Sequence, residues 1–167
     1  ECMRVLVTGA TGFVGRRLVA ALLAETTHDV TVLVRDAASY DPPAGVTVVE
    51  GDVLDPGSFE AALADADVAY YLIHAMGASG DFAERDRRAA RNFERAASEA
   101  GIERVIYLSG LGSEGDTLSS HLASRREVET LLRAGSADVT VLRAAIIIGD
   151  GSASFRLIYQ LATRLPV

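Results

Sequence analysis

The chain of 167 residues contains no lysine, so all 16 of its basic residues are arginine. No lysine side chain is therefore available to form a Schiff base or to act as a catalytic ammonium group. The single cysteine, Cys2, cannot form an internal disulfide and has no cysteine or histidine near it at metal-ligand spacing, so we expect no structural metal. A net charge of −7 leaves no basic excess to neutralise phosphates, which argues against nucleic-acid binding.

Long apolar runs are also absent from the sequence. None approaches the roughly 18 uninterrupted apolar residues that a membrane span needs, and no basic-then-apolar signal segment precedes the first apolar strand. We therefore expect a cytoplasmic protein without a membrane span. The length and the 49% hydrophobic content fit one domain over residues 1–167. Because no closing element follows the last predicted helical stretch, we expect this domain to be truncated before a C-terminal substrate region.

Apolar runs alternate with amphipathic stretches along the whole chain, a pattern typical of a parallel sheet with helices on its faces. Right-handed crossovers then predict a doubly wound α/β fold, the Rossmann sheet with strand order 3-2-1-4-5-6. The six predicted strands are short and rich in valine, isoleucine, leucine or tyrosine. They are Arg4–Thr8, Val30–Val34, Val46–Glu50, Val68–Ile73, Arg104–Leu108 and Val139–Arg143.

Helices are predicted between these strands. A crossover helix with apolar residues at helical spacing follows the first strand, from Val14 to Leu22. A short helix is predicted from Pro56 through Leu63, with Asp55 as its cap. Two longer helices, each followed by a glycine expected in a left-handed cap conformation, are Asp81–Ala100 with Gly101 and Ser120–Ala134 with Gly135.

The loop Thr8-Gly9-Ala10-Thr11-Gly12-Phe13-Val14-Gly15 follows a strand and opens a helix, which is the context of a phosphate-binding glycine motif. Gly9 permits the sharp turn off the strand, Gly12 lets the backbone approach a pyrophosphate, and Gly15 lets the helix pack closely against the strand. The amino-terminal end of the helix offers free N–H groups and partial positive charge to the anion. The loop therefore predicts a site for NAD or NADP.

The choice between the two dinucleotides depends on the end of the second strand. A dinucleotide fold places there an acidic residue for the adenosine ribose or an arginine for a 2′-phosphate. This chain has both, as Arg35 and Asp36. Arg35 directly after the strand favours NADP, because a guanidinium group matches phosphate oxygens bidentately, while Asp36 could hold the free ribose diol of NAD.

Three motifs in the expected order, Thr8-Gly-x-x-Gly-x-x-Gly15, Gly51-Asp52-Val53 and Tyr107-Leu108-Ser109, resemble extended or atypical short-chain dehydrogenases/reductases. This group includes sugar-nucleotide epimerases and NmrA-like regulators. The resemblance implies that Asp52 accepts a hydrogen bond from the adenine amino group. The cofactor-binding residues implied by the glycine loop, the second strand and this resemblance are Gly9, Thr11, Gly12, Phe13, Val14, Gly15, Arg35, Asp52, Val53, Ile73, His74, Ala75, Met76, Arg125, Ala145 and Ile146.

The resemblance also locates a catalytic centre. Active members carry a tyrosine, and a lysine four residues later, on one face of the helix after the fifth strand, where the ammonium group lowers the phenol pKa. Here these positions hold His121 and Arg125, and the aligned serine position holds Leu111, which leaves Ser109 and Ser113 as substitutes. Histidine can exchange a proton near neutral pH and Arg125 can hold the ribose, so His121, Arg125 and Ser109 are the candidate catalytic residues.

Each of these residues also has a purely structural interpretation. His121 could be an exposed residue at a helix start, Arg125 a solvated or ribose-binding side chain, and His74 a polar residue at a strand end. We therefore expect either an NAD(P)-dependent oxidoreductase or epimerase-like enzyme acting on a small substrate, with sugar nucleotides as one candidate class, or a non-catalytic redox sensor or assembly subunit. A third interpretation is a Rossmann domain that binds no cofactor. Relatives often dimerise through the helix 81–100, so its exposed face is either a homodimer interface or, as its mixed charges more often indicate, a solvated surface.

Overall fold

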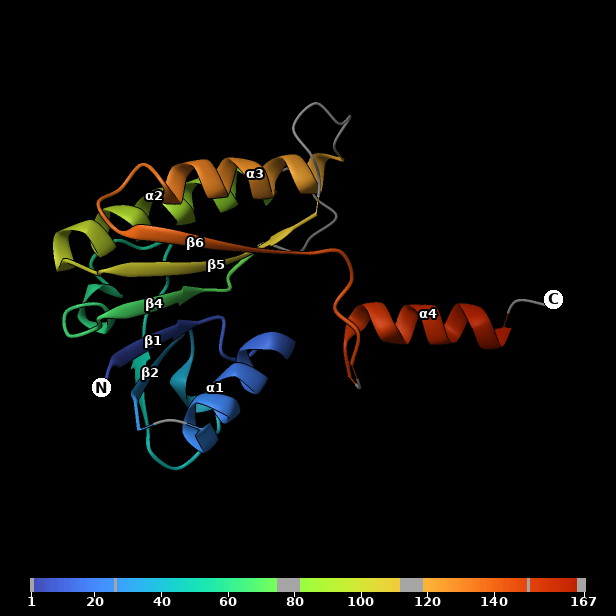
Figure 1. Ribbon diagram of the computed structural model, residues 1–167, viewed down its shortest axis with the longest axis horizontal. Coiled ribbons are helices and arrows are strands. Elements are labelled where there is room, and N and C mark those ends of the chain that lie inside the picture. Colours follow the sequence, from blue (N-terminus) through green and yellow to red (C-terminus); the bar gives the residue numbers. More distant parts are fainter. Residues whose placement is uncertain (1, 26, 75–81, 112–118, 150, 165–167) are drawn as a thin grey trace.

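The computed structural model describes residues 2–25, 27–74, 82–111, 119–149 and 151–164. Six parallel strands form one sheet in the order β3-β2-β1-β4-β5-β6, which confirms the predicted Rossmann topology. Helix α1 lies on one face of the sheet, and α2 and α3 lie on the other (Figure 1). In chain order the elements are β1 (Arg4–Thr8), α1 (Phe13–Glu25), β2 (Asp29–Val34), η1 (Ala37–Ser39), β3 (Val46–Glu50), η2 (Glu60–Ala62), β4 (Val68–Tyr71), α2 (Phe82–Ala100), β5 (Arg104–Gly110), α3 (Ser120–Leu132), β6 (Asp138–Ala144) and α4 (Ala153–Arg164).

The sheet has one hydrophobic cluster on each of its two faces. Valines of β1 and β2 pack with α1 on one side, and a larger cluster joins β4 and β5 to α2 and α3 on the other. In the larger cluster the ring centroids of Tyr71 and Phe93 lie 4.8 Å apart, and those of Tyr71 and Tyr107 lie 6.0 Å apart. Aromatic pairs at these separations add to the stabilisation from burial alone. They anchor α2 firmly against β4 and β5.

The predicted helix from Pro56 through Leu63 is wrong. Only a single 3-10 turn, Glu60–Ala62, forms there, because Gly57 adopts φ 95° and the Glu60 carboxylate accepts hydrogen bonds from the backbone N–H groups of Gly57 and Phe59. Asp55 does not cap a helix with its side chain; its backbone carbonyl accepts a hydrogen bond from Ser58 Oγ at 2.7 Å. Local side-chain hydrogen bonds here replace helical ones.

The two glycines expected to cap helices behave differently. Gly101 has φ 72° after α2, as predicted. Gly135 does not have a positive φ, so that prediction is wrong. A Cβ atom on Gly135 would lie 2.3 Å from Glu94 Oε1 and 2.7 Å from Ser98 Oγ, so a larger residue here would have to displace these two side chains of α2.

The carboxyl-terminal helix α4 extends away from the sheet (Figure 1). Most of the exposed large apolar side chains among the described residues belong to β6, α4 and the segment between them, and they are Leu142, Ile146, Ile148, Phe155, Leu157, Ile158, Tyr159 and Leu161. Among the described residues, no helix combines the length and the apolar character that crossing a membrane requires.

Candidate functional site

The glycine loop forms a tight turn between β1 and α1. Gly9 has φ 70°, and its carbonyl oxygen accepts a hydrogen bond from Gly12 N at 3.0 Å. A Cβ atom on Gly15 would lie only 2.2 Å from that same oxygen, so this position must be glycine, as predicted. No acidic residue lies in the first turn of α1. The helix start therefore suits a bound pyrophosphate, since nothing there opposes negative charge.

Phe13 links this loop to the segment that follows β6. The Arg17 guanidinium carbon lies 3.8 Å from the Phe13 ring centroid, a cation–π contact. A Cβ atom on Gly149 would lie 2.7 Å from Phe13 Cζ, so the backbone at Gly149 lies directly against the ring. The first and last parts of the domain thus meet beside the glycine loop.

Arg35 and Asp36 directly follow β2, and their side chains differ in the contacts that they make. Asp36 caps η1, because one carboxylate oxygen accepts from Ala38 N at 3.0 Å and the other accepts from the Ser39 hydroxyl. The Ser39 hydrogen bond in particular holds the pKa of Asp36 below its usual value. The exposed Arg35 side chain contacts no charged or hydrogen-bonding group elsewhere in the described part of the chain. Its guanidinium group therefore remains available to a ligand.

Asp52 and Val53 lie in the turn after β3. The Asp52 Oδ1 atom accepts a hydrogen bond from Leu54 N at 2.8 Å, and the Asn92 amide of α2 donates to the Val53 carbonyl oxygen at 2.8 Å. Val53 is buried in the core and Asp52 is half-buried. The turn is thus fixed by side-chain hydrogen bonds, and the adenine contacts of Asp52 and Val53 stay predictions.

Thr8 fixes the segment that follows β4. Its Oγ1 donates to the Tyr70 carbonyl oxygen at 2.9 Å and accepts from Leu72 N at 3.2 Å. The strand ends at Tyr71, two residues earlier than predicted, and Ile73 and His74 lie in the loop beyond it. Ala75 and Met76, which were predicted to contact the cofactor, lie outside the described residues.

His121 and Arg125 are in direct contact on α3. The Arg125 Nε group donates to His121 Nε2 at 3.2 Å, and Arg125 NH1 donates to the Leu108 carbonyl oxygen of β5 at 2.9 Å. A Cβ atom on Gly110 would lie 2.6 Å from Leu122 Cδ2, so the glycine lets α3 approach the end of β5. Arg125 therefore bridges His121 to the carboxyl-terminal edge of the sheet.

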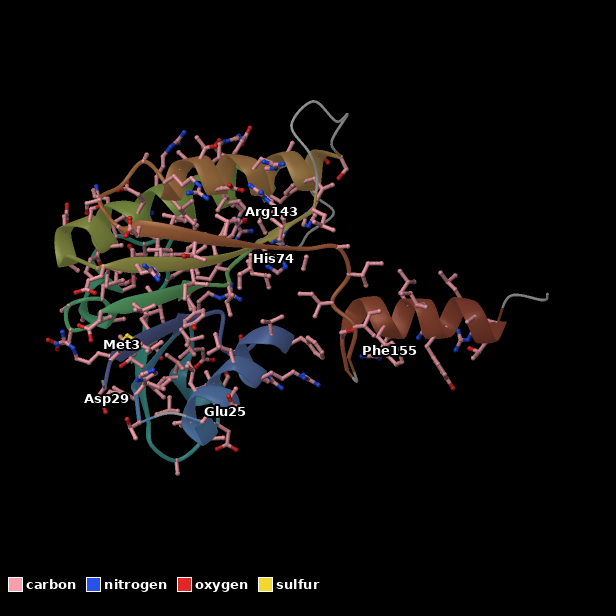
Figure 2. The ribbon with its side chains drawn as sticks, in the orientation of Figure 1. Met3, Glu25, Asp29, His74, Arg143 and Phe155 are labelled. Carbon is pink, nitrogen blue, oxygen red and sulfur yellow. The ribbon has the colours of Figure 1, made fainter. Side chains whose placement is uncertain are left out.

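His74 lies opposite this pair. Its ring centroid is 6.5 Å from that of His121, with the two planes at 74°. Burial lowers the pKa of the half-buried His74, and the positive charge of Arg125 lowers it further, while the Asp86 carboxylate raises it in part. Figure 2 shows His74 at the edge where the parallel strands end, whereas Met3 and Asp29 mark the opposite edge. The sheet thus brings together the two histidines and the arginine that the sequence singled out.

Ser109 lies on β5 and is buried, with 3% of its surface exposed. Burial raises the pKa of the neighbouring Tyr107 phenol, while the Arg125 charge and the Ser109 hydroxyl lower it in part. By its hydrogen-bond geometry, Ser109 Oγ has no partner within the described parts of the chain. Leu111 is 51% exposed, and Ser113 lies outside the described residues.

Two buried polar residues behind the site were not identified from the sequence. Asp86 of α2 is 6% exposed and accepts a hydrogen bond from Ser124 Oγ of α3 at 3.2 Å. Asp86 precedes Ala89, Ala90 and Phe93 at helical spacing, so it interrupts an apolar face. A carboxylate in an apolar stripe is the signal that could have identified it.

The last two predicted cofactor-binding residues lie in the segment that follows β6. Ala145 and Ile146 are exposed in the loop beyond β6. Just before them, Arg143 NH2 donates to both oxygens of Glu129, at 2.7 and 3.1 Å. Glu129 is itself buried on α3, and Arg133 also pairs with it at 3.4 Å. Arg143 is therefore held toward α3, and the cofactor contacts of Ala145 and Ile146 stay predictions.

Known proteins share this sequence pattern and fold. A family profile described as NAD(P)H-binding matches residues 9–164. The chain is 34% identical to the ceramide reductase of Caulobacter vibrioides over 167 residues, which cover 98% of this chain and 52% of that protein. This chain thus spans about half the length of that relative.

Solved structures with bound dinucleotide have the same fold. The Bordetella bronchiseptica enzyme WbmG in complex with NAD superposes with a TM-score of 0.80 at 24% identity, covering 98% of this chain and 60% of WbmG. The Citrobacter triphenylmethane reductase complexed with NADP(H) superposes with a TM-score of 0.75 at 24% identity, covering 86% and 50% of the two chains. At these identities the superpositions show the fold alone. One of the two proteins was solved with NAD and the other with NADP(H).

Proposed function

The chain belongs to the NAD(P)H-binding family and has the Rossmann fold of atypical short-chain dehydrogenases/reductases, and on this premise we propose that it is the nucleotide-binding part of an NAD(P)H-dependent oxidoreductase. Its substrate would be a small carbonyl compound, with sugar nucleotides as one class to test. The observation that carries the proposal is the group His74, His121 and Arg125, which lies at the carboxyl-terminal edge of the sheet. Ligands of open α/β sheets bind at this edge.

The glycine loop fits the dinucleotide that this function requires. A side chain at Gly15 would collide with the loop backbone, and the start of α1 carries no opposing acid. The loop residues Gly9–Gly15 would hold the pyrophosphate, and Arg125 would use its remaining guanidinium N–H groups to hold the ribose near the nicotinamide. When bound, the cofactor supplies or accepts the hydride.

We further propose that NADP is the preferred cofactor. Support comes from the hydrogen bonds of Asp36 to Ala38 and Ser39, which engage the acid that would otherwise hold a free ribose diol. Arg35 next to it has an exposed guanidinium group that suits a 2′-phosphate. Arg35→Ala should weaken NADPH binding about tenfold or more and leave NADH binding within about twofold, because loss of a charge-assisted hydrogen bond costs more than about 1.4 kcal/mol. Arg104→Ala, at the start of β5, is the matched control.

Turnover by the whole protein is the direct test of the oxidoreductase proposal. NADPH and NADH oxidation would be followed at 340 nm against a panel of carbonyl compounds and sugar nucleotides. We expect turnover with at least one carbonyl class and a loss of about 10²–10⁴-fold in kcat/KM when the proton-exchanging side chain is removed. Tight NADPH binding without turnover on any member of the panel would contradict the proposal.

A second candidate function is supported by two specific observations. Arg125 occupies Nε2 of His121, and the exposed Leu111 stands where active relatives carry a hydroxyl residue. A domain with this arrangement could bind the dinucleotide without chemistry and report the redox state to a partner protein. This function predicts that the reduced and oxidised cofactors bind with different affinities and that a partner shifts that difference. Equal affinities in calorimetry would exclude it.

A further inference from the structure

Two histidines face each other at the proposed site, and only one of them has a ring nitrogen suited to exchange a proton. His74 comes from the loop after β4 and His121 from the first turn of α3. Their centroids lie 6.5 Å apart, and Phe82 of α2 lies 6.5 Å from His121 on another side. Strand β4 and helices α2 and α3 therefore all border this pair.

Arg125 restricts the protonation of His121. Because Arg125 Nε donates to His121 Nε2, that nitrogen must present its lone pair, and the His121 proton must reside on Nδ1. A neutral imidazole in this tautomer can offer a hydrogen bond. It cannot give up a proton as an acid unless Nε2 is first protonated, which would set two N–H donors against each other. Arg125 cannot easily move away, because its NH1 group is bound to the Leu108 carbonyl oxygen.

His74 differs from His121 in what surrounds its ring nitrogens. The N–H of Leu72, two residues earlier, donates to Thr8 Oγ1 at 3.2 Å and fixes the start of the segment that carries His74. Among the described residues, no donor occupies a His74 ring nitrogen in the way that Arg125 Nε occupies His121 Nε2. A ring nitrogen of His74 can therefore take up or release a proton.

We propose that His74 is the catalytic residue that exchanges a proton with the substrate, and that His121 and Arg125 are positioning residues that orient substrate and cofactor around it. This inference rests on the oxidoreductase function proposed above. In the reducing direction, imidazolium His74 gives its proton to the carbonyl oxygen as the hydride from NAD(P)H reaches the carbonyl carbon. The C=O π bond breaks, C–H and O–H bonds form, the nicotinamide is oxidised, and neutral His74 regains a proton from water.

The charged groups around His74 determine the pH at which this exchange works. Burial, the Arg125 charge and His121 lower the pKa of His74, and Asp86 on α2 opposes them. His74 is therefore largely neutral at pH 7, which suits acceptance of a proton from an alcohol. We expect the oxidising direction to lose rate as pH falls through the pKa of His74, and the reducing direction to gain rate over the same range.

The titration of His74 can be tested without cofactor. The chain has three histidines, so asparagine substitutions at positions 28, 74 and 121 assign each imidazole signal in proton–carbon NMR spectra. We expect His74 to titrate below 6.5, with a higher pKa in Arg125→Met and a lower one in Asp86→Asn. His28→Asn, at the opposite edge of the sheet, should leave the His74 titration unchanged. A His74 titration that does not respond to Arg125→Met would overturn the inference.

Kinetics of the whole protein separate the inference from the function on which it rests. His74→Asn should lower kcat/KM about 10²–10⁴-fold and flatten its pH profile while NADPH affinity stays within about threefold. His121→Asn should keep the pH dependence and mainly raise KM. Turnover with an unchanged pH profile in His74→Asn overturns this inference alone. If the unaltered protein shows no turnover, the proposed function and the inference both fall, whatever the NMR titration gives.

Discussion

Ser124 of α3 donates a hydrogen bond from its hydroxyl to Asp86 Oδ2 of α2, and both side chains are almost completely buried. The bond joins the two helices that carry the residues around His74. A buried carboxylate needs such donors, because an unsatisfied buried charge costs far more than a hydrogen bond contributes.

Ser124→Ala should therefore destabilise the fold by about 1–2 kcal/mol, since it removes one donor from a buried carboxylate. Urea unfolding measures this difference. Ser120→Ala, an exposed serine one turn earlier on the same helix, is the matched control and should stay within about 0.5 kcal/mol of the unaltered chain. Equal effects of the two substitutions would mean that the bond between Ser124 and Asp86 contributes no stability.

Gly15 offers a second test, in which stability and cofactor binding should change together. Its Cβ would lie 2.2 Å from Gly9 O and 2.8 Å from Ala10 Cα, both backbone atoms. Gly15→Ala should cost about 1–3 kcal/mol through overpacking and weaken NADPH binding at least tenfold, because α1 must move away from the loop. NADPH fluorescence titration and urea unfolding measure the two effects.

Gly101 provides the control for that substitution. It has φ 72° but open space around its Cα, so Gly101→Ala should cost about 1 kcal/mol through its backbone conformation alone. Its distance from the loop should leave NADPH affinity unchanged. A Gly15→Ala variant that binds NADPH normally would contradict the role assigned to the loop.

The fold could be predicted from the sequence because its signals are local and repeated. Alternating apolar strands and amphipathic helices identify a doubly wound sheet, and the glycine loop identifies its first crossover. The resemblance read from three short motifs is confirmed by the family match over residues 9–164. Errors arose where side chains compete with the helical backbone, as when Glu60 closes the turn at Gly57. Such hydrogen bonds cannot be read from periodicity.

The candidate site was only partly predictable, since its contacts join residues far apart in the chain. His74, His121 and Arg125 were each identified from their positions, but the hydrogen bond that fixes the His121 tautomer depends on the rotamer of Arg125. Asp86 lies among the many charged residues of α2, and its residue type alone does not set it apart from them. Its burial follows from the packing of α2 against α3 and β5, which no spacing rule specifies.

The Glu129 carboxylate is a second buried charge behind the site, and its contribution to stability can be measured. It accepts two hydrogen bonds from Arg143 and one from Arg133, and its side chain is 10% exposed. Glu129→Gln should destabilise the fold by about 1–2 kcal/mol, because charge-assisted hydrogen bonds to Arg143 are replaced by a weaker neutral one. Arg133→Gln removes only a half-exposed pair and should cost no more than about 0.5 kcal/mol. Thermal and urea unfolding of the two variants should reproduce this order.

The lowered pKa of His74 also predicts how stability depends on pH. Its pKa in the folded chain lies below the 6.5 of the unfolded chain, so the unfolded state binds more protons between the two values. The contribution of His74 to stability is complete above pH 6.5 and declines as pH falls toward the folded-state pKa, by at most about 1.4 kcal/mol per pH unit.

Unfolding free energies between pH 8 and pH 5.5 measure this decline. The carboxylates whose pKa is lowered, among them Asp36, Glu60 and Asp67, lose their contributions only at lower pH and do not interfere. His74→Asn should remove part of the decline, whereas His28→Asn should retain that part. If the unaltered chain and His74→Asn lose stability in parallel over this range, the half-buried imidazole of His74 does not have the lowered pKa on which the proposed proton exchange depends.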